Sequence, residues 1–189
     1  MSLLACQVVP LVATPSLELT IPTMSQGQVT GHHTNTYCEW EDESYLLERK
    51  ELDLSGQELW HVQRTLAVFN ATDVLPTAST IRYRDGTMVT SERTYTEQLE
   101  TATEALLIDG VLQMRKVYSY NANHELIGLE QFVYTISGEF SRHERYALVS
   151  KGEKNYLKRE ELSSDGALVK DYPMVMANSL IPSGVMIDV

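Results

Sequence analysis

Apolar and polar residues alternate along most of the chain from Tyr45 onward. This alternation places successive side chains on opposite faces of an extended backbone, so it predicts β-strands rather than helices. Short clusters of Gly, Asn, Asp and Ser interrupt the alternation and favour turns. We therefore predict strands over residues 45–54, 58–69, 80–84, 87–96, 106–120, 125–136, 141–150, 155–162 and 167–172, with a break at Asp109-Gly110 as the alternative for residues 106–120.

A strand–turn–strand phrase recurs with drift in this pattern. Its copies cover residues 45–69, 112–134 and 156–170, and their turns lie at 55–57, 121–124 and 163–166. Long hairpins of this kind build antiparallel sheets, and closing a sheet into a barrel removes its edge strands. The predicted fold class is all-β: an antiparallel up-and-down meander that forms a lipocalin-like barrel of eight to ten strands. A β-sandwich and an open curved sheet are the alternatives.

The first part of the chain has a different character. Pro10, Pro15 and Pro22 break any long helix, while residues 16–21 alternate and predict an edge strand. At 189 residues the chain fits one domain. We predict an N-terminal extension or edge strand over residues 1–30 and a single β-barrel domain over residues 31–189. Residues 95–107 have a helix-like composition, which predicts a short helix or a turn there.

Charge narrows the range of partners. The chain has 15 Lys and Arg against 26 Asp and Glu, so its net charge is −11. Such an acidic surface repels phosphates and anionic lipids, which argues against nucleic-acid and membrane partners. The sequence contains no run of 18 apolar residues, so no transmembrane helix is predicted. We expect a soluble, cytoplasmic protein in which Cys6 and Cys38 are free thiols.

The N-terminal residues share some features with an export signal. Residues 3–6 have the form of a bacterial lipoprotein cleavage box that ends at Cys6, but no Lys or Arg precedes Arg49. The positive region of a signal peptide is therefore missing, and an ordinary leader or first strand is expected.

Charged residues interrupt the apolar faces of several predicted strands. Arg64 lies between apolar residues on the face that carries Trp60, and Glu130 does so on the face of Phe132. A buried charge costs free energy unless it is paired, so such positions are typical of a cavity that holds a ligand. The candidate ligand-binding residues are Trp60, Arg64, Lys116, Tyr118, Glu130, Phe132 and Tyr134. A structural Arg64–Glu130 ion pair, or exposure of both residues, is the alternative interpretation.

Motifs that carry chemistry on their own are missing. The sequence has no Gly-rich phosphate loop, no Gly-x-Ser-x-Gly and no Cys-x-x-Cys. His32 and His33 point to opposite faces of a strand, so we predict no metal site. The acidic run at 39–43 around Trp40 is interpreted as a solvated turn, with contact to a basic partner as the alternative. The catalytic residues of any enzymatic activity stay unknown.

One hairpin carries a family resemblance. Residues 113–134, Gln-Met-Arg-Lys-Val-Tyr-Ser-Tyr-Asn-Ala-Asn-His-Glu-Leu-Ile-Gly-Leu-Glu-Gln-Phe-Val-Tyr, resemble the late-barrel hairpin of lipocalin-like cyanobacterial proteins. These belong to the calycin superfamily, near the phycobiliprotein lyases. The resemblance implies a closed or nearly closed barrel that binds an extended apolar or tetrapyrrole-like ligand, such as a bilin delivered to a cysteine of a partner protein. No lyase site residue is carried over to this chain.

Three functional hypotheses follow. The first is a binding barrel for a small hydrophobic molecule, with a chaperone-like role toward a partner protein. The second is a protein-interaction or assembly module with a filled core and an acidic surface, including assembly as a homodimer. The third is an enzyme on the same barrel, such as a lyase or isomerase, in which an Arg/Glu pair polarises the ligand.

Overall fold

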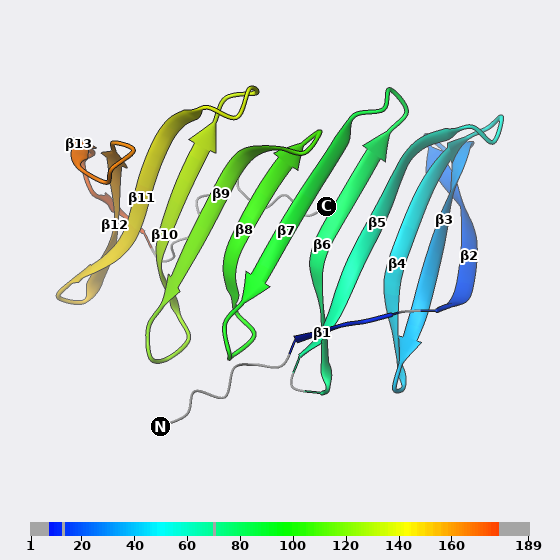
Figure 1. Cartoon of the computed structure of the whole chain (residues 1–189), viewed down its shortest axis with the longest axis horizontal. Coiled ribbons are helices and arrows are strands. Elements are labelled where there is room, and N and C mark those ends of the chain that lie inside the picture. Colours follow the sequence, from blue (N-terminus) through cyan, green and yellow to red (C-terminus); the bar gives the residue numbers. More distant parts are fainter. Residues whose placement is uncertain (1–7, 13, 70, 178–189) are drawn as a thin grey trace. The chain divides into compact units, whose positions relative to one another are not determined.

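The chain folds into antiparallel strands that follow one another in sequence order. The computed structural model describes residues 8–12, 14–69 and 71–177, and these contain fourteen strands and no helix. Figure 1 shows the strands running alternately up and down. The prediction of an all-β antiparallel meander is confirmed. The strand count exceeds the eight to ten that were expected, and closure into a barrel stays a prediction.

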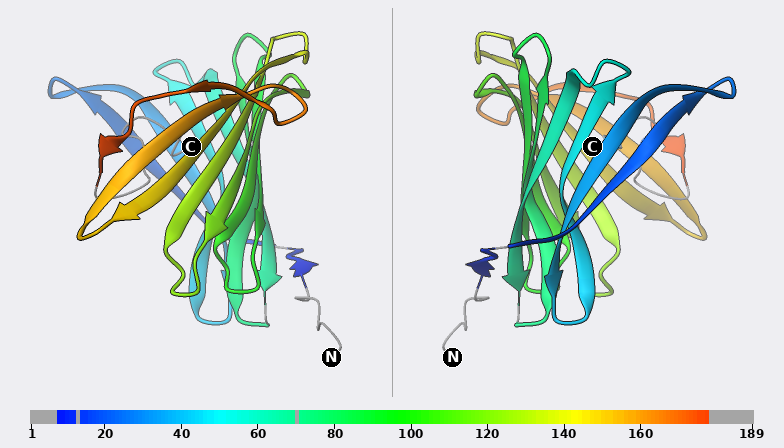
Figure 2. Two further views of the ribbon diagram at one scale, coloured as in Figure 1. Left: turned by 90° about the vertical axis from the view of Figure 1, so that its left-hand side faces the viewer. Right: turned by 90° about the vertical axis from the view of Figure 1, so that its right-hand side faces the viewer.

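The chain divides into two compact units. The first extends to Glu92 and also includes residues 108–110, and the second contains residues 93–107 and the chain from Val111 onward. In the first unit hydrogen bonds join the strands in the order β2-β3-β4-β5-β6-β7, and β2 is the terminal strand. Figure 2 shows the strong twist of the β2–β3 hairpin. The strands are β1 (Val8–Pro10), β2 (Pro15–Ser25), β3 (Gln28–Trp40), β4 (Glu43–Asp53), β5 (Glu58–Phe69), β6 (Asp73–Tyr83) and β7 (Met88–Tyr95).

The second unit begins with the last residues of β7 and continues the same meander. Its strands are joined in the order β8-β9-β10-β11-β12-β13, and β14 also pairs with β12. They are β8 (Thr101–Ile108), β9 (Val111–Tyr120), β10 (Leu126–Tyr134), β11 (Phe140–Lys151), β12 (Lys154–Leu162), β13 (Leu168–Asp171) and β14 (Val175–Met176).

A repeated five-residue turn closes many of the hairpins. In one copy the Asn121 N–H donates to the Glu125 carbonyl over 3.0 Å, and Asn121 Oδ1 accepts from the N–H groups of Asn123 and Glu125. The fourth residue is left-handed, which favours glycine, although His124 holds φ +64° in this copy. The same backbone closure recurs in the turns that begin at Asp53, Tyr83, Thr96, Thr135 and Ser163. The drifting sequence phrase therefore corresponds to a structural repeat.

The helix-like composition of residues 95–107 is misleading. The segment forms the turn between Thr96 and Glu100, and Thr101 then opens β8. The turn half of the prediction is confirmed and the helix half is wrong. Thr96 Oγ1 accepts from the N–H groups of Gln98 and Glu100. A side-chain acceptor that bonds two backbone donors stabilises a turn in competition with a helix.

The first unit has a small apolar core. Buried Cys38, Leu66, Val68 and Val74 form it, and partly buried residues that include Trp40 pack against it. Cys38 is a free thiol, and burial raises its pKa. Cys6 and the cleavage-box residues lie outside the described residues. In the described part of the chain there is also no helix of the length and apolarity needed to cross a membrane.

The left-handed turn position gives a stability prediction. Gly86 has φ +92°, and a Cβ built there meets no atom within 4 Å, so Gly86→Ala changes only the backbone conformational energy. We expect a loss of roughly 1–2 kcal/mol in the free energy of unfolding. Urea denaturation measures it. The exposed turn residue Gln98 provides the control, because Gln98→Ala should change stability by no more than about 0.5 kcal/mol. Equal effects of both substitutions would contradict the turn assignment.

Candidate functional site

A change of neighbours along β5 creates a groove in the first unit. β4 pairs with β5 between Leu52–Glu58 and Glu48–Gln63. Beyond Gln63 the N-terminal strand β1 takes the place of β4: Val9 lies opposite Val68, and the Leu11 N–H donates to the Leu66 carbonyl over 3.0 Å. β4 remains paired with β3 as far as Trp40. Trp40 therefore lies across the gap that opens between β4 and β5.

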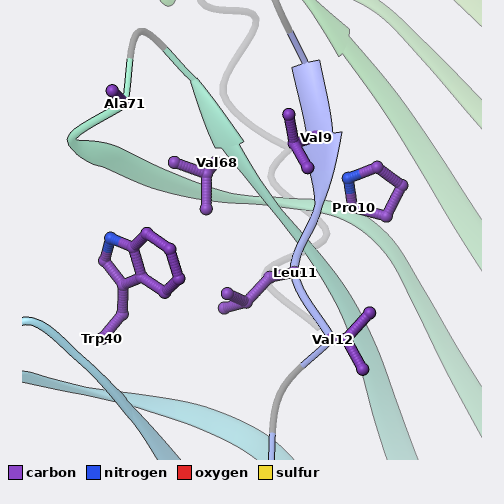
Figure 3. A pocket seen from close by; sticks show the side chains of 7 residues that line it. All are labelled: Val9, Pro10, Leu11, Val12, Trp40, Val68 and Ala71. Carbon is purple, nitrogen blue, oxygen red and sulfur yellow. The ribbon is translucent and has the colours of Figure 1, made fainter.

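The groove has a volume of about 450 Å³ and an apolar lining. Figure 3 shows Leu11 of the N-terminal segment pointing toward the indole of Trp40, with Val68 beside them. The Trp40 Nε1 atom is buried and has no hydrogen-bond partner among the described residues. A buried donor without an acceptor costs about 1–3 kcal/mol, so this N–H favours an acceptor supplied by a ligand. The lining residues are Val9, Pro10, Leu11, Val12, Trp40, Val68 and Ala71.

The predicted residues Trp60 and Arg64 share one face of β5 in the first unit. The guanidinium of Arg49 on β4 lies over the Trp60 ring, 5.4 Å from its centre. Arg64 pairs in register with Ser79 of β6. The structure places neither Trp60 nor Arg64 in the lining of the groove. Their role in ligand binding stays a prediction.

The predicted residues Lys116 and Tyr118 meet an acidic residue in the second unit. The Lys116 side chain is only 2% exposed, and its Nζ donates to Glu104 Oε2 over 3.1 Å. The Tyr118 hydroxyl donates to the same oxygen over 3.2 Å, and Arg93 donates to Glu104 Oε1. Burial alone would raise the pKa of Glu104, but Lys116 and Arg93 together lower it. Burial, reinforced by the Glu104 charge, raises the pKa of Tyr118.

A fully buried carboxylate lies on the same face of the second unit. Glu144 of β11 is 2% exposed, accepts a hydrogen bond from Tyr146 over 2.8 Å and pairs with Arg142 and Arg159. Burial would raise the pKa of Glu144, but these partners outweigh it and lower the pKa. Burial and the bond to Glu144 raise the pKa of Tyr146 to about 12.

The β9–β10 register separates the remaining predicted residues from Lys116. Lys116 lies opposite Gln131, whereas Glu130 lies opposite Val117, so Lys116 and Glu130 point to opposite faces of the sheet. Tyr118 shares the face of Lys116, and Phe132 shares the face of Glu130. The predicted set is therefore not brought together on one face.

Glu130 and the aromatic residues near it have partners on β11. His143 Nε2 and Arg145 Nε each lie 3.1 Å from a carboxylate oxygen of Glu130. The Phe132 ring stacks on the His143 ring with their centres 4.1 Å apart. Tyr134 contacts Phe140 edge to face. These contacts fit a structural role for the face, and they do not test its role in binding.

The sequence analysis did not select several residues that the structure places in the groove or in charged clusters. Trp40 was interpreted as part of a solvated acidic turn, yet it packs against the core and lines the groove. Glu104 lies in the segment with helix-like composition. Arg49 lies in a strand that carries several charged residues of both signs, so composition gave no reason to select it. In the predicted strand over residues 45–54, Arg49 and Glu51 are two residues apart and therefore share a face. This shared face was the available sequence signal.

No protein-family model and no curated protein matches this chain. Among the described residues no group of three or more His, Cys, Asp and Glu side chains is placed to hold a metal ion.

Removing Glu104 tests the buried ionic cluster. Glu104→Gln leaves the ammonium of Lys116 buried without a carboxylate, so we expect a loss of about 3 kcal/mol in the free energy of unfolding. Lys116→Met in the same chain removes the orphaned charge and should restore part of that loss. Urea denaturation of the single and double variants measures both effects. A double variant less stable than Glu104→Gln alone would show that Lys116 does not depend on Glu104.

The carboxylates of Glu104 and Glu144 also predict a pH dependence. The pKa values of Glu104 and Glu144 are lowered from 4.5 in the folded state, so unfolding takes up protons when the pH falls below 4.5. Their contribution to stability is complete above that pH and is lost as the pH falls through the folded-state pKa values. Melting temperatures between about pH 6 and about pH 3 measure this loss. Glu104→Gln should flatten the dependence, and an unchanged slope would contradict the assignment.

Proposed function

We propose that the protein binds a small, uncharged, predominantly apolar molecule in the groove between β1, Trp40 and β5. The observation that carries the proposal is the buried Trp40 Nε1–H, which lacks an acceptor in an otherwise apolar lining. A ligand that supplies one acceptor, such as a carbonyl oxygen, would satisfy this donor while its apolar part covers Leu11 and Val68.

Size and charge define the ligand class further. A volume of about 450 Å³ lies within the usual range of small-molecule sites, about 300–1,000 Å³. The lining contains no charged residue, and the chain has a net charge of −11. An anionic ligand would find no partner in the groove and would be repelled by the protein. These features favour a neutral molecule.

The more specific expectations rest on the hairpin resemblance alone. Membership of the calycins, a bilin as ligand, and delivery of that ligand to a partner protein stay predictions. Enzymatic turnover also stays untested. The groove lining contains no acid, base or nucleophile.

A protein-interaction role is the second candidate, favoured by the terminal strand β2. Leu17, Leu19 and Ile21 alternate along it, and each is more than 40% exposed. A terminal strand offers unpaired backbone groups to an extended segment of another protein, and the alternating apolar side chains would add contact area. The partner would carry an extended apolar segment, either as another protein or as a second copy of this chain.

The groove is tested with Nile red, a neutral apolar dye with a carbonyl acceptor. We expect saturable binding with increased dye emission. Trp40→Phe keeps the aromatic ring but removes the N–H, and should weaken binding about two- to tenfold. Val9→Asp places a charge on the lining and should weaken binding more. The matched control is Trp60→Phe, because Trp60 lies outside the groove. Equal dissociation constants for Trp40→Phe and Trp60→Phe would contradict the proposal.

A further inference from the structure

The outer edge of β2 is a surface that the groove does not use. β2 ends the strand order of the first unit, so one edge of its backbone pairs with β3 and no described strand pairs with the other (Figure 1). Every residue of β2 except Thr23 is exposed. An exposed strand of eleven residues with a free edge offers backbone N–H and C=O groups to a further strand. The edge is therefore open to pairing with another chain.

The side chains of β2 define what such a chain has to supply. Leu17, Leu19 and Ile21 share one face, because successive residues of a strand point to opposite faces. Their exposed fractions are 43%, 42% and 42%. Glu18 and Thr20 lie between them on the other face. A partner strand that carries three apolar side chains at the same spacing of two residues would cover this row.

A second copy of β2 supplies a matching row. When two copies pair antiparallel with Leu19 opposite Leu19 of the second copy, Leu17 of each copy lies opposite Ile21 of the other. Three apolar pairs then lie side by side on one face, and cross-strand pairs of this kind stabilise a sheet. Glu18, the one charged residue of β2, lies opposite Thr20. The arrangement has two-fold symmetry, which is the commonest symmetry of homodimers.

The neighbouring registers are less favourable. A pairing centred on Glu18 brings the two Glu18 side chains face to face, and like charges directly opposite each other are destabilising. A pairing centred on Thr20 places Leu17 opposite Thr23 and reduces the apolar pairs from three to two. The pairing centred on Leu19 avoids both costs. The side chains therefore favour one register.

The distribution of charge also favours β2 as the place where two copies meet. The chain has a net charge of −11, so two copies repel each other in general. β2 carries one charged residue among eleven, so contact through it brings few like charges together. We propose that two copies of the chain associate by antiparallel pairing of their β2 strands, centred on Leu19. This proposal rests on the protein-interaction role of β2 and names its partner as a second copy.

Disulfide cross-linking reads the register directly. The background is Cys6→Ser, and Cys38 stays because it is fully buried. With oxidised glutathione as the oxidant, Leu19→Cys should form a covalent dimer, because its two thiols lie opposite each other. Leu17→Cys alone and Ile21→Cys alone should form none. A mixture of these two proteins, distinguished by mass, should form the heterodimer.

Light scattering after gel filtration, over a series of protein concentrations, measures the association itself. Leu19→Lys removes the central apolar pair and places two ammonium groups opposite each other, so it should raise the dissociation constant of the dimer at least about tenfold. Leu54→Lys is the matched control, because Leu54 is 67% exposed and lies outside β2, and it should leave the constant unchanged. Added salt should strengthen the dimer by screening the repulsion between two acidic copies. Urea denaturation verifies that each variant is folded.

The proposal is overturned by a monomer at every concentration, by self-cross-linking of Leu17→Cys as efficient as that of Leu19→Cys, or by equal effects of Leu19→Lys and Leu54→Lys. A monomer that instead binds an extended apolar peptide, and loses this binding in Leu19→Lys, overturns the second copy as partner while the interaction role of β2 stands. Failure of both dimer and peptide overturns that role as well. Nile red binding in the groove is independent of all these outcomes, because β2 contributes no residue to the lining.

Discussion

The architecture of the first unit depends on an exchange of hydrogen-bond partners along β5. As far as Gln63, this edge of β5 pairs with β4. From Ala67 to Phe69 the same edge pairs with β1. Because β1 pairs with the end of β5 that β4 leaves, with the Leu11 N–H bonded to the Leu66 carbonyl, that end of β5 keeps a hydrogen-bonded neighbour while β4 stays with β3. Trp40, at the end of β3, is thereby held across the gap from Val68. The groove is a direct consequence of this exchange.

Several of the buried side chains in the second unit are charged residues that form ion pairs. The largest fully buried side chains in the described part of the protein are Lys116, Glu144 and Cys38. Buried ion pairs add little net stability, but breaking one is costly, so they penalise a wrong strand register. A one-residue slip of β9 would turn Lys116 away from its sheet face. We interpret the Lys116 and Glu144 clusters as devices that fix the register of a meander whose strands resemble one another.

Strand positions were largely predictable from sequence, because period-2 alternation and turn residues are local signals. The polar stretch from Ser25 was interpreted as a loop or as a loop that enters a strand, and the structure places most of it in β3. The first half of β6, which contains Pro76, was not predicted as a strand because its composition is atypical. Site geometry was far less predictable. Bulges at Tyr37 and Leu66 shift the register, and the β9–β10 pairing separates Lys116 from Glu130. The pairing of β1 with the end of β5 joins distant segments, so no local pattern indicated it.

The indole resonances of the protein test the central claim most directly. The chain has two tryptophans, so its proton–nitrogen spectrum should contain two indole N–H signals. The account predicts that saturating Nile red moves the Trp40 signal downfield, as formation of a hydrogen bond requires, and leaves the Trp60 signal in place. A Trp40 signal that does not move while the dye binds, or a shift confined to Trp60, would contradict the assignment of the groove as the binding site.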